Sequence, residues 1–115
     1  MKILLTVLSL LLPLSAPAQQ LSPEISRLIS FVETSSCQFN RNGAWHSSSE
    51  AAAHIRRKYE AALGKGLVHS AEDFIRAAAS QSSLSGAPYT VQCQGGPVIR
   101  CADWLTGELR RIRGR

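Results

Sequence analysis

Residues 89–101 read YTVQCQGGPVIRC, and this stretch decides what kind of domain the chain forms. From Tyr89 to Cys93 apolar residues alternate with polar ones, a pattern typical of a half-buried β-strand. Gly95-Gly96 fits a two-residue hairpin turn, so that residues 97–100 form the returning strand. The segments on either side have helical patterns, and the sequence therefore predicts one short β-hairpin in a helical domain.

Two helices with capped starts are predicted in the first half of the mature chain. A Ser-Pro pair, typical of an N-cap followed by the first helical position, opens a helix over about residues 23–35. A capping box that begins at Ser47 opens a second helix, which ends at Gly64. Between the two helices we expect a loop over residues 37–45, with its turn at Arg41-Asn42-Gly43.

Two further helices complete the pattern. Ser70 opens a third helix whose first turn carries acidic residues, which suit the positive end of the helix dipole. Residues 80–86 then form a small polar loop, and the last helix runs from Asp103 to about Ile112. The expected fold class is mainly α (α+β): a small disulfide-stapled domain with about four helices and one short β-hairpin.

The three cysteines of the chain can pair in three ways. The expected hairpin register places Cys93 opposite Val98, and it separates Cys93 from Cys101 by roughly 10 Å, beyond the ~7 Å limit for a disulfide. We therefore favour a long-range bond from Cys37, with Cys93 as the better partner because it lies inside a strand. Cys101 is then a free thiol at the start of a helix, where it is either activated or, as we favour, buried and inert.

Residues 1–18 have the layout of a secretory signal peptide. A lysine precedes an apolar run over residues 3–12, and Ala16-Pro17-Ala18 supplies the small residues that a signal peptidase reads, so cleavage is expected after Ala18. The apolar run is too short to span a bilayer, which needs roughly 20 residues. We expect a single mature domain over residues 19–115, located in the periplasm, with no membrane span.

The formal net charge of +5 comes mainly from a basic C-terminal tail. Once the lysine of the signal is removed, the arginines of the tail account for the whole excess, so the body of the domain is formally neutral. Export argues against a nucleic-acid partner, although residues 48–80 superficially resemble a helix–turn–helix. A solvated terminus is favoured over contact with a membrane or a polyanion. The tail arginines are Arg110, Arg111, Arg113 and Arg115.

No motif for a metal, a cofactor or a nucleophile is present in the sequence. The histidines His46, His54 and His69 form no i, i+4 pair, and no Cys-x-x-Cys accompanies them, so we expect no metal and no cofactor. The chain also contains neither a phosphate-binding Gly-x-x-x-x-Gly-Lys loop nor a Gly-x-Ser-x-Gly nucleophile motif.

The polar residues that capping does not require gather in two loops and on one helix. His54 and Lys58 lie one helical turn apart and could line a pocket for an anion, or could have purely structural roles. If the loops on either side of the second helix converge, they complete one ligand-binding surface with these two residues. The candidate site residues are Arg41, Asn42, His54, Lys58, Ser83 and Ser85.

Five motifs in order resemble the YfeK-like family of small exported proteins, a domain of unknown function. They are CQFNRNG at 37–43, EAAAH with Lys58-Tyr59 at 50–59, SAEDFI at 70–75, SSLSGAPY with Cys93 at 82–93, and Trp104-Leu105. The resemblance covers about residues 24–110. It implies a periplasmic home, one domain and a Cys37–Cys93 disulfide, with Cys101 as a departure where relatives would have serine. It implies no activity and no catalytic residue.

Together these features predict an exported periplasmic domain that acts by binding rather than by catalysis. Its partner would be another envelope protein or a small polar ligand. One alternative is a small periplasmic hydrolase in which His54 acts on Ser83, Ser85 or a carboxylate. A second alternative is a redox or covalent-dimer role for the thiol of Cys101, and a third is a purely structural envelope component.

Overall fold

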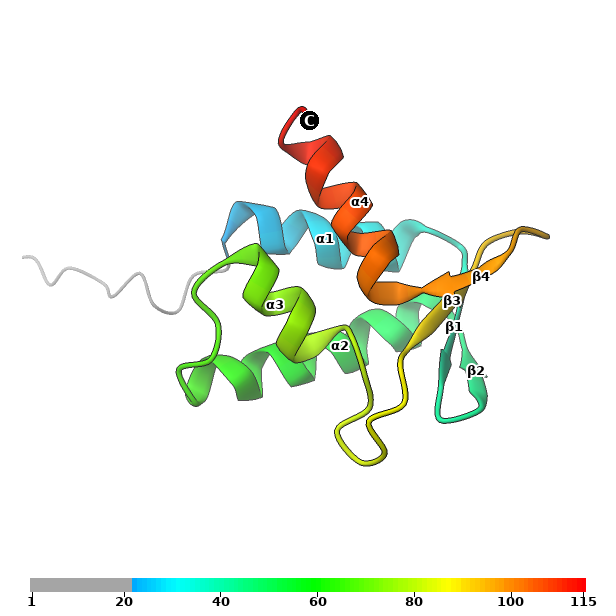
Figure 1. The fold of residues 1–115 in the computed structure, drawn as a ribbon, viewed down its shortest axis with the longest axis horizontal. Helices are drawn as coiled ribbons and strands as arrows, with labels where there is room; N and C mark the ends of the chain where they lie inside the picture. Colours follow the sequence, from blue (N-terminus) through cyan, green and yellow to red (C-terminus); the bar gives the residue numbers. More distant parts are fainter. Residues whose placement is uncertain (1–21) are drawn as a thin grey trace, which may run out of the picture.

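The structure is a computed structural model that describes residues 22–115. It contains four helices and one four-stranded antiparallel sheet, which confirms the expected α+β class (Figure 1). The predicted signal peptide and its cleavage site lie outside the described residues. The helices are α1 (Pro23–Thr34), α2 (Ser48–Gly64), α3 (Ala71–Ala78) and α4 (Cys101–Ile112).

The helices begin where side chains satisfy the first free backbone N–H groups. The Ser22 hydroxyl accepts a hydrogen bond from the Ile25 N–H, and the Ser70 hydroxyl accepts one from the Asp73 N–H. Ser47 and Glu50 form the predicted capping box at the start of α2. Helix α4 begins two residues earlier than expected, at Cys101, and no side chain caps it; the Cys101 N–H instead donates to the Tyr89 carbonyl oxygen at 2.9 Å.

The sheet is larger than the sequence indicated. The expected loop over residues 37–45 is wrong: it contains β1 (Gln38–Arg41) and β2 (Ala44–His46), joined at Asn42 and Gly43 with φ of 54° and 85°. These strands are too short and too polar to give a recognisable alternation. They form because β1 pairs with β3 (Thr90–Gln92), which gives the strand order β2-β1-β3-β4.

The predicted hairpin is present, but its register is shifted by one residue. β4 (Val98–Arg100) pairs with β3 so that Gln92, not Cys93, lies opposite Val98. The turn is centred on Gln94 and Gly95, both with positive φ, and the Gly96 N–H closes it on the Cys93 carbonyl oxygen at 2.7 Å. A Cβ at position 96 would lie 2.9 Å from that oxygen, so the tight turn requires glycine there.

The predicted disulfide between Cys37 and Cys93 is confirmed. Gln38 pairs with Gln92 across β1 and β3, so the two cysteines are the next cross-strand pair beyond the ladder. The bond therefore holds β1 in register on β3. Cys101 is a free thiol with 1% of its surface exposed.

The core lies between the four helices and one face of the sheet. Tyr59 of α2 packs edge-to-face against Phe74 of α3, with ring centroids 5.3 Å apart. Phe39 and Val91 face this core from neighbouring strands. Helices and sheet thus hold the first turns of α2 beside the β1–β2 turn and the loop that follows α3 (Figure 1).

The arginine tail is part of the folded domain. Gly114, with φ of 76°, ends α4, because its N–H and that of Arg115 bond to carbonyl oxygens of the last helical turn. Arg113 forms ion pairs with Glu24 and Glu72, and its side chain is only 24% exposed. The expectation of a solvated terminus is therefore wrong for Arg113, since partners from two distant helices meet at the chain end.

Candidate ligand site

The two loops that flank α2 converge, as the candidate site requires. The Asn42 amide nitrogen donates to the Ser82 hydroxyl at 3.0 Å, and the Ser85 hydroxyl donates to the Asn42 amide oxygen at 2.6 Å. In Figure 1 the β1–β2 turn and the loop after α3 extend from the same side of the domain. Asn42 thus joins two loops that are some 40 residues apart in sequence.

A hollow of about 280 Å³ lies between these loops and α2, and we call it the α2 hollow. Five of the six predicted residues line it; the exception is Ser85, which bonds to Asn42 and to the Ala87 N–H. Sequence reasoning missed three further lining residues. The α2 hollow is lined by Arg41, Asn42, His54, Lys58, Ser82, Ser83, Leu84 and Tyr89.

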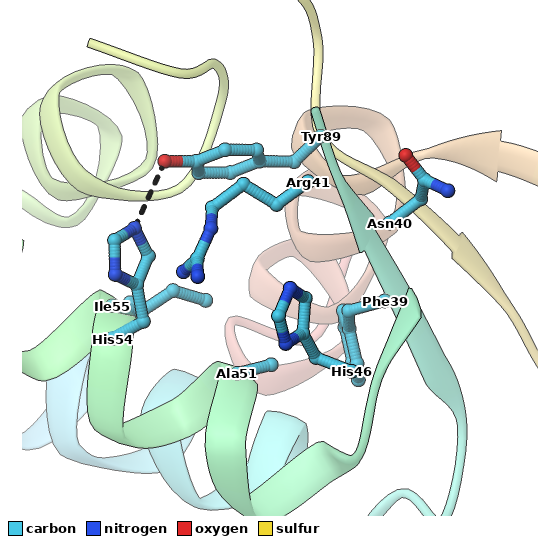
Figure 2. Close-up of a pocket in the computed structure, with 8 residues that line it drawn as sticks. All are labelled: Phe39, Asn40, Arg41, His46, Ala51, His54, Ile55 and Tyr89. Carbon is cyan, nitrogen blue, oxygen red and sulfur yellow. Dashed lines mark hydrogen bonds between the residues drawn. The ribbon is translucent and has the colours of Figure 1, made fainter. Parts of the chain in front are cut away.

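Tyr89 is the central residue of the α2 hollow, although the strand pattern indicates only a core position for it. Its ring is indeed buried, with 5% of the residue exposed. A buried tyrosine nevertheless needs a partner for its hydroxyl group, which was the available signal. That hydroxyl lies 3.1 Å from the His54 Nε2 (Figure 2). It also lies 3.0 Å from the Lys58 Nζ.

The hydrogen-bond directions follow from the chemistry of these three groups. The Lys58 ammonium can only donate, and it donates to the Tyr89 hydroxyl oxygen and, at 2.7 Å, to the Gln81 carbonyl oxygen. The phenolic hydrogen of Tyr89 is then free to donate to a neutral His54 at Nε2. We therefore assign the His54 proton to Nδ1.

The site favours the neutral form of His54. Burial lowers the pKa of His54 from 6.5 to about 4, and the positive charges of Arg41 and Lys58 add to this effect. Arg57 and His46 contribute in the same direction. Within residues 22–115, neither Arg41 nor Lys58 has a carboxylate at ion-pair distance.

The acidic group that is affected by the charge of Arg41 is Glu50, at the start of α2. Its carboxylate accepts a hydrogen bond of 2.9 Å from the Ser47 N–H as part of the capping box. Hydrogen bonds from Ser47 hold the pKa of Glu50 below its ordinary value, and the charges of His46 and Arg41 contribute less. Glu50 is thus held at the helix start by hydrogen bonds and offsets only part of the charge of Arg41.

A smaller pocket adjoins the α2 hollow and shares Arg41, His54 and Tyr89 with it. Its volume of about 20 Å³ is room for about one water molecule. In Figure 2 the Arg41 side chain extends from β1 beneath the Tyr89 ring, whereas Asn40 points away from the other side chains. Apolar groups such as Ile55 and Phe39 contribute to its wall, which accounts for the desolvation of His54.

The geometry offers little to the catalytic alternatives. Across the described residues, no hydrogen bond joins His54 to a serine or to a carboxylate, and its Nε2 is bonded to Tyr89. In the same part of the chain, no three potential ligands are grouped to hold a metal ion. Burial raises the pKa of the Cys101 thiol to about 12, so this group is protonated and shielded at neutral pH.

The fold is that of a small disulfide-linked α+β domain, and comparison with known proteins places it in a family. The chain belongs to the DUF5329 family, a family of unknown function whose model matches residues 19–113. It is 37% identical over 94 residues to the uncharacterized protein YfeK of Salmonella typhimurium, covering 76% of this chain and 75% of that protein. The resemblance seen in the sequence motifs is therefore confirmed.

No solved structure matches this chain. None of the helices between residues 22 and 115 has the length and hydrophobicity needed to cross a membrane.

Proposed function

We propose that this protein is an exported periplasmic domain that binds a small polar ligand in the α2 hollow and does not catalyse a reaction. The observation that carries the proposal is that two positively charged side chains line one hollow. Arg41 and Lys58 come from different elements, line the same hollow and lack an acidic partner among the described residues. Like charges kept together beside a histidine with a shifted pKa are typical of functional sites.

Export is supported by two independent features. The first is the signal-like pattern of residues 1–18, and the second is the Cys37–Cys93 disulfide, which is typical of oxidising compartments. Expression of the full chain with its own leader in a Gram-negative host tests this part. We expect the protein in the periplasmic fraction, with the intact mass of a chain that begins at Gln19. A protein that stays in the cytoplasm and keeps residues 1–18 would contradict export.

Binding is tested by an NMR titration of the ¹⁵N-labelled mature domain with the small-molecule fraction of a periplasmic extract. We expect amide shifts confined to the β1–β2 turn, the middle of α2 and residues 82–85. Arg41→Gln should abolish these shifts with little change in stability, because Arg41 makes no side-chain hydrogen bond within the described residues. The matched control is Lys65→Ala, which removes a positive charge from the end of α2, away from the hollow.

Either of two results would contradict binding in the α2 hollow. One is a set of shifts that maps elsewhere on the domain, and the other is a response of Arg41→Gln that equals that of the wild type. Shifts that come only from added periplasmic proteins would indicate an envelope partner instead. A loss of signal dispersion in Arg41→Gln would show that the residue is structural.

A further inference from the structure

The charges around the α2 hollow define the chemistry of an occupant. Arg41 reaches it from β1 and Lys58 from α2, and Figure 2 shows Arg41 directed toward the His54–Tyr89 pair. Glu50 is the acidic residue on which the charge of Arg41 acts. Its carboxylate is already hydrogen-bonded to the Ser47 N–H at the start of α2. A cationic ligand would add to the repulsion between these charges, whereas an anion would relieve it.

The size and the rim of the α2 hollow further restrict which ligands can bind there. A volume of about 280 Å³ lies just below the usual range for drug-sized ligands, roughly 300–1,000 Å³. It suits one small acid or one headgroup. Leu84, which is 93% exposed, gives the rim an apolar residue, so an attached apolar group would be tolerated.

We infer that the α2 hollow binds a carboxylate or phosphate group and that His54 takes up one proton from solvent when this anion binds. The inference rests on the proposed function, since it specifies the ligand of the same site. The anion is either a free small acid or the headgroup of a lipid, and both would make the same contacts with Arg41 and Lys58.

The coupling follows from the groups that surround His54. Arg41 on β1, His46 on β2, and Lys58 and Arg57 on α2 are the positively charged or titratable groups whose fields disfavour its protonation, and Tyr89 is its hydrogen-bond partner. A bound anion opposes these fields and raises the pKa of His54 above about 4, its value in the domain without ligand. Because the bound form holds its proton at higher pH, the affinity rises as the pH falls toward 4 and levels off below it.

Tyr89 allows this proton to be accommodated without breaking the hydrogen bond. When Nε2 of His54 is protonated, it donates to the Tyr89 hydroxyl oxygen, which also accepts from Lys58. The phenolic hydrogen must then turn away from His54. It becomes a donor that is available to the bound anion.

Calorimetric titration with sulfate at fixed ionic strength tests the coupling, because sulfate does not titrate between pH 4.5 and 7.5 and any pH dependence belongs to the protein. We expect the affinity to rise on acidification with a slope that approaches about tenfold per pH unit. His54→Gln, which keeps a hydrogen-bonding group beside Tyr89, should bind sulfate without this slope. Arg41→Gln should lose binding at every pH, and Lys65→Ala should match the wild type.

Parallel arms with inorganic phosphate, and with vesicles of phosphatidylglycerol or phosphatidylcholine, separate the two sources of the anion. Binding of the free ions points to a small acid, and binding only to phosphatidylglycerol vesicles points to a lipid headgroup. If no anion binds in any arm while the periplasmic extract still shifts the amides of the hollow, the anion inference is wrong and the proposed function stands. An unchanged slope in His54→Gln would overturn the proton uptake alone.

Discussion

The guanidinium of Arg113 donates two hydrogen bonds, each of 2.8 Å, to the carboxylate of Glu24, which lies 89 residues earlier in the chain. The same guanidinium donates to the Glu72 carboxylate at 2.6 and 3.1 Å. Planar two-point contacts of this kind are stronger than single hydrogen bonds. One arginine thus ties the end of α4 to the first turns of α1 and α3.

Arg113→Ala should lower the melting temperature at pH 7 by a few degrees. Arg113→Lys should recover only part of the loss, because a lysine keeps the charge but not the planar fork. Arg115→Ala, a removal of charge two residues further on, is the matched control and should change little. Thermal unfolding of the four proteins measures this, and equal effects at positions 113 and 115 would show that the ion pairs contribute nothing.

The contribution of Arg113 should disappear in acid. Its hydrogen bonds lower the pKa of Glu72 from 4.5 to about 2 and also lower that of Glu24. A carboxylate whose pKa is lowered by folding stabilises the fold at any pH above its pKa in the unfolded chain. This stabilisation is lost as the pH falls through its pKa in the folded protein. The difference between wild type and Arg113→Ala should therefore shrink between pH 4.5 and 2.

The Cys37–Cys93 disulfide should provide a large part of the stability of so small a domain. It closes a loop with a sequence separation of 56 residues, for which the chain-entropy model gives about 4 kcal/mol. The double variant Cys37→Ser with Cys93→Ser should lose about this amount in urea unfolding, and added reductant should not destabilise it further. A loss below about 1 kcal/mol would mean that the sheet register holds without the covalent bond.

The Cys101 thiol should be inert in the folded protein. It is 1% exposed and burial raises its pKa, so both access and the reactive thiolate are suppressed. A colorimetric thiol reagent at pH 8 should detect one thiol per chain only after denaturation. Rapid reaction of the native protein, or a dimer that reductant dissociates, would instead support the thiol-linked alternative.

His54 should make the stability of the unliganded domain fall in mild acid. The unfolded chain takes up a proton near pH 6.5, whereas the folded protein resists it until about pH 4, so stability is lost as the pH falls between these values and no further loss from this residue occurs below them. His54→Gln should flatten this part of the profile in denaturant unfolding. A slope that is the same in His54→Gln as in the wild type would contradict this assignment.

Local patterns predicted the helices well and the sheet poorly. The caps at Ser22, Ser47 and Ser70 act within a few residues, so their geometry can be inferred without knowing the fold. β1 and β2 are four and three residues long, with few apolar positions, and they become strands only because β1 pairs with β3 and β2 pairs with β1. The one-residue error at the hairpin arose because Gly95-Gly96 suggested a shorter turn than the one that forms around Gln94.

The candidate site was predicted by composition, but its chemistry was not. Surplus polar residues at Arg41, Asn42, His54, Lys58 and Ser83 indicated the hollow that they line. The strand pattern, however, counted Tyr89 as a core residue, although its hydroxyl group links His54 to Lys58.

Short-range signals in the chain were thus sufficient for its helix starts and its fold class, because each depends on nearby residues. The sheet order, the partners of Arg113 and the neutral state of His54 depend on groups 30 to 90 residues apart. Only packing brings such groups into contact, and burial then sets the strength of their electrostatic interaction. For this reason the α2 hollow and its charge state follow from the tertiary structure and not from any local motif.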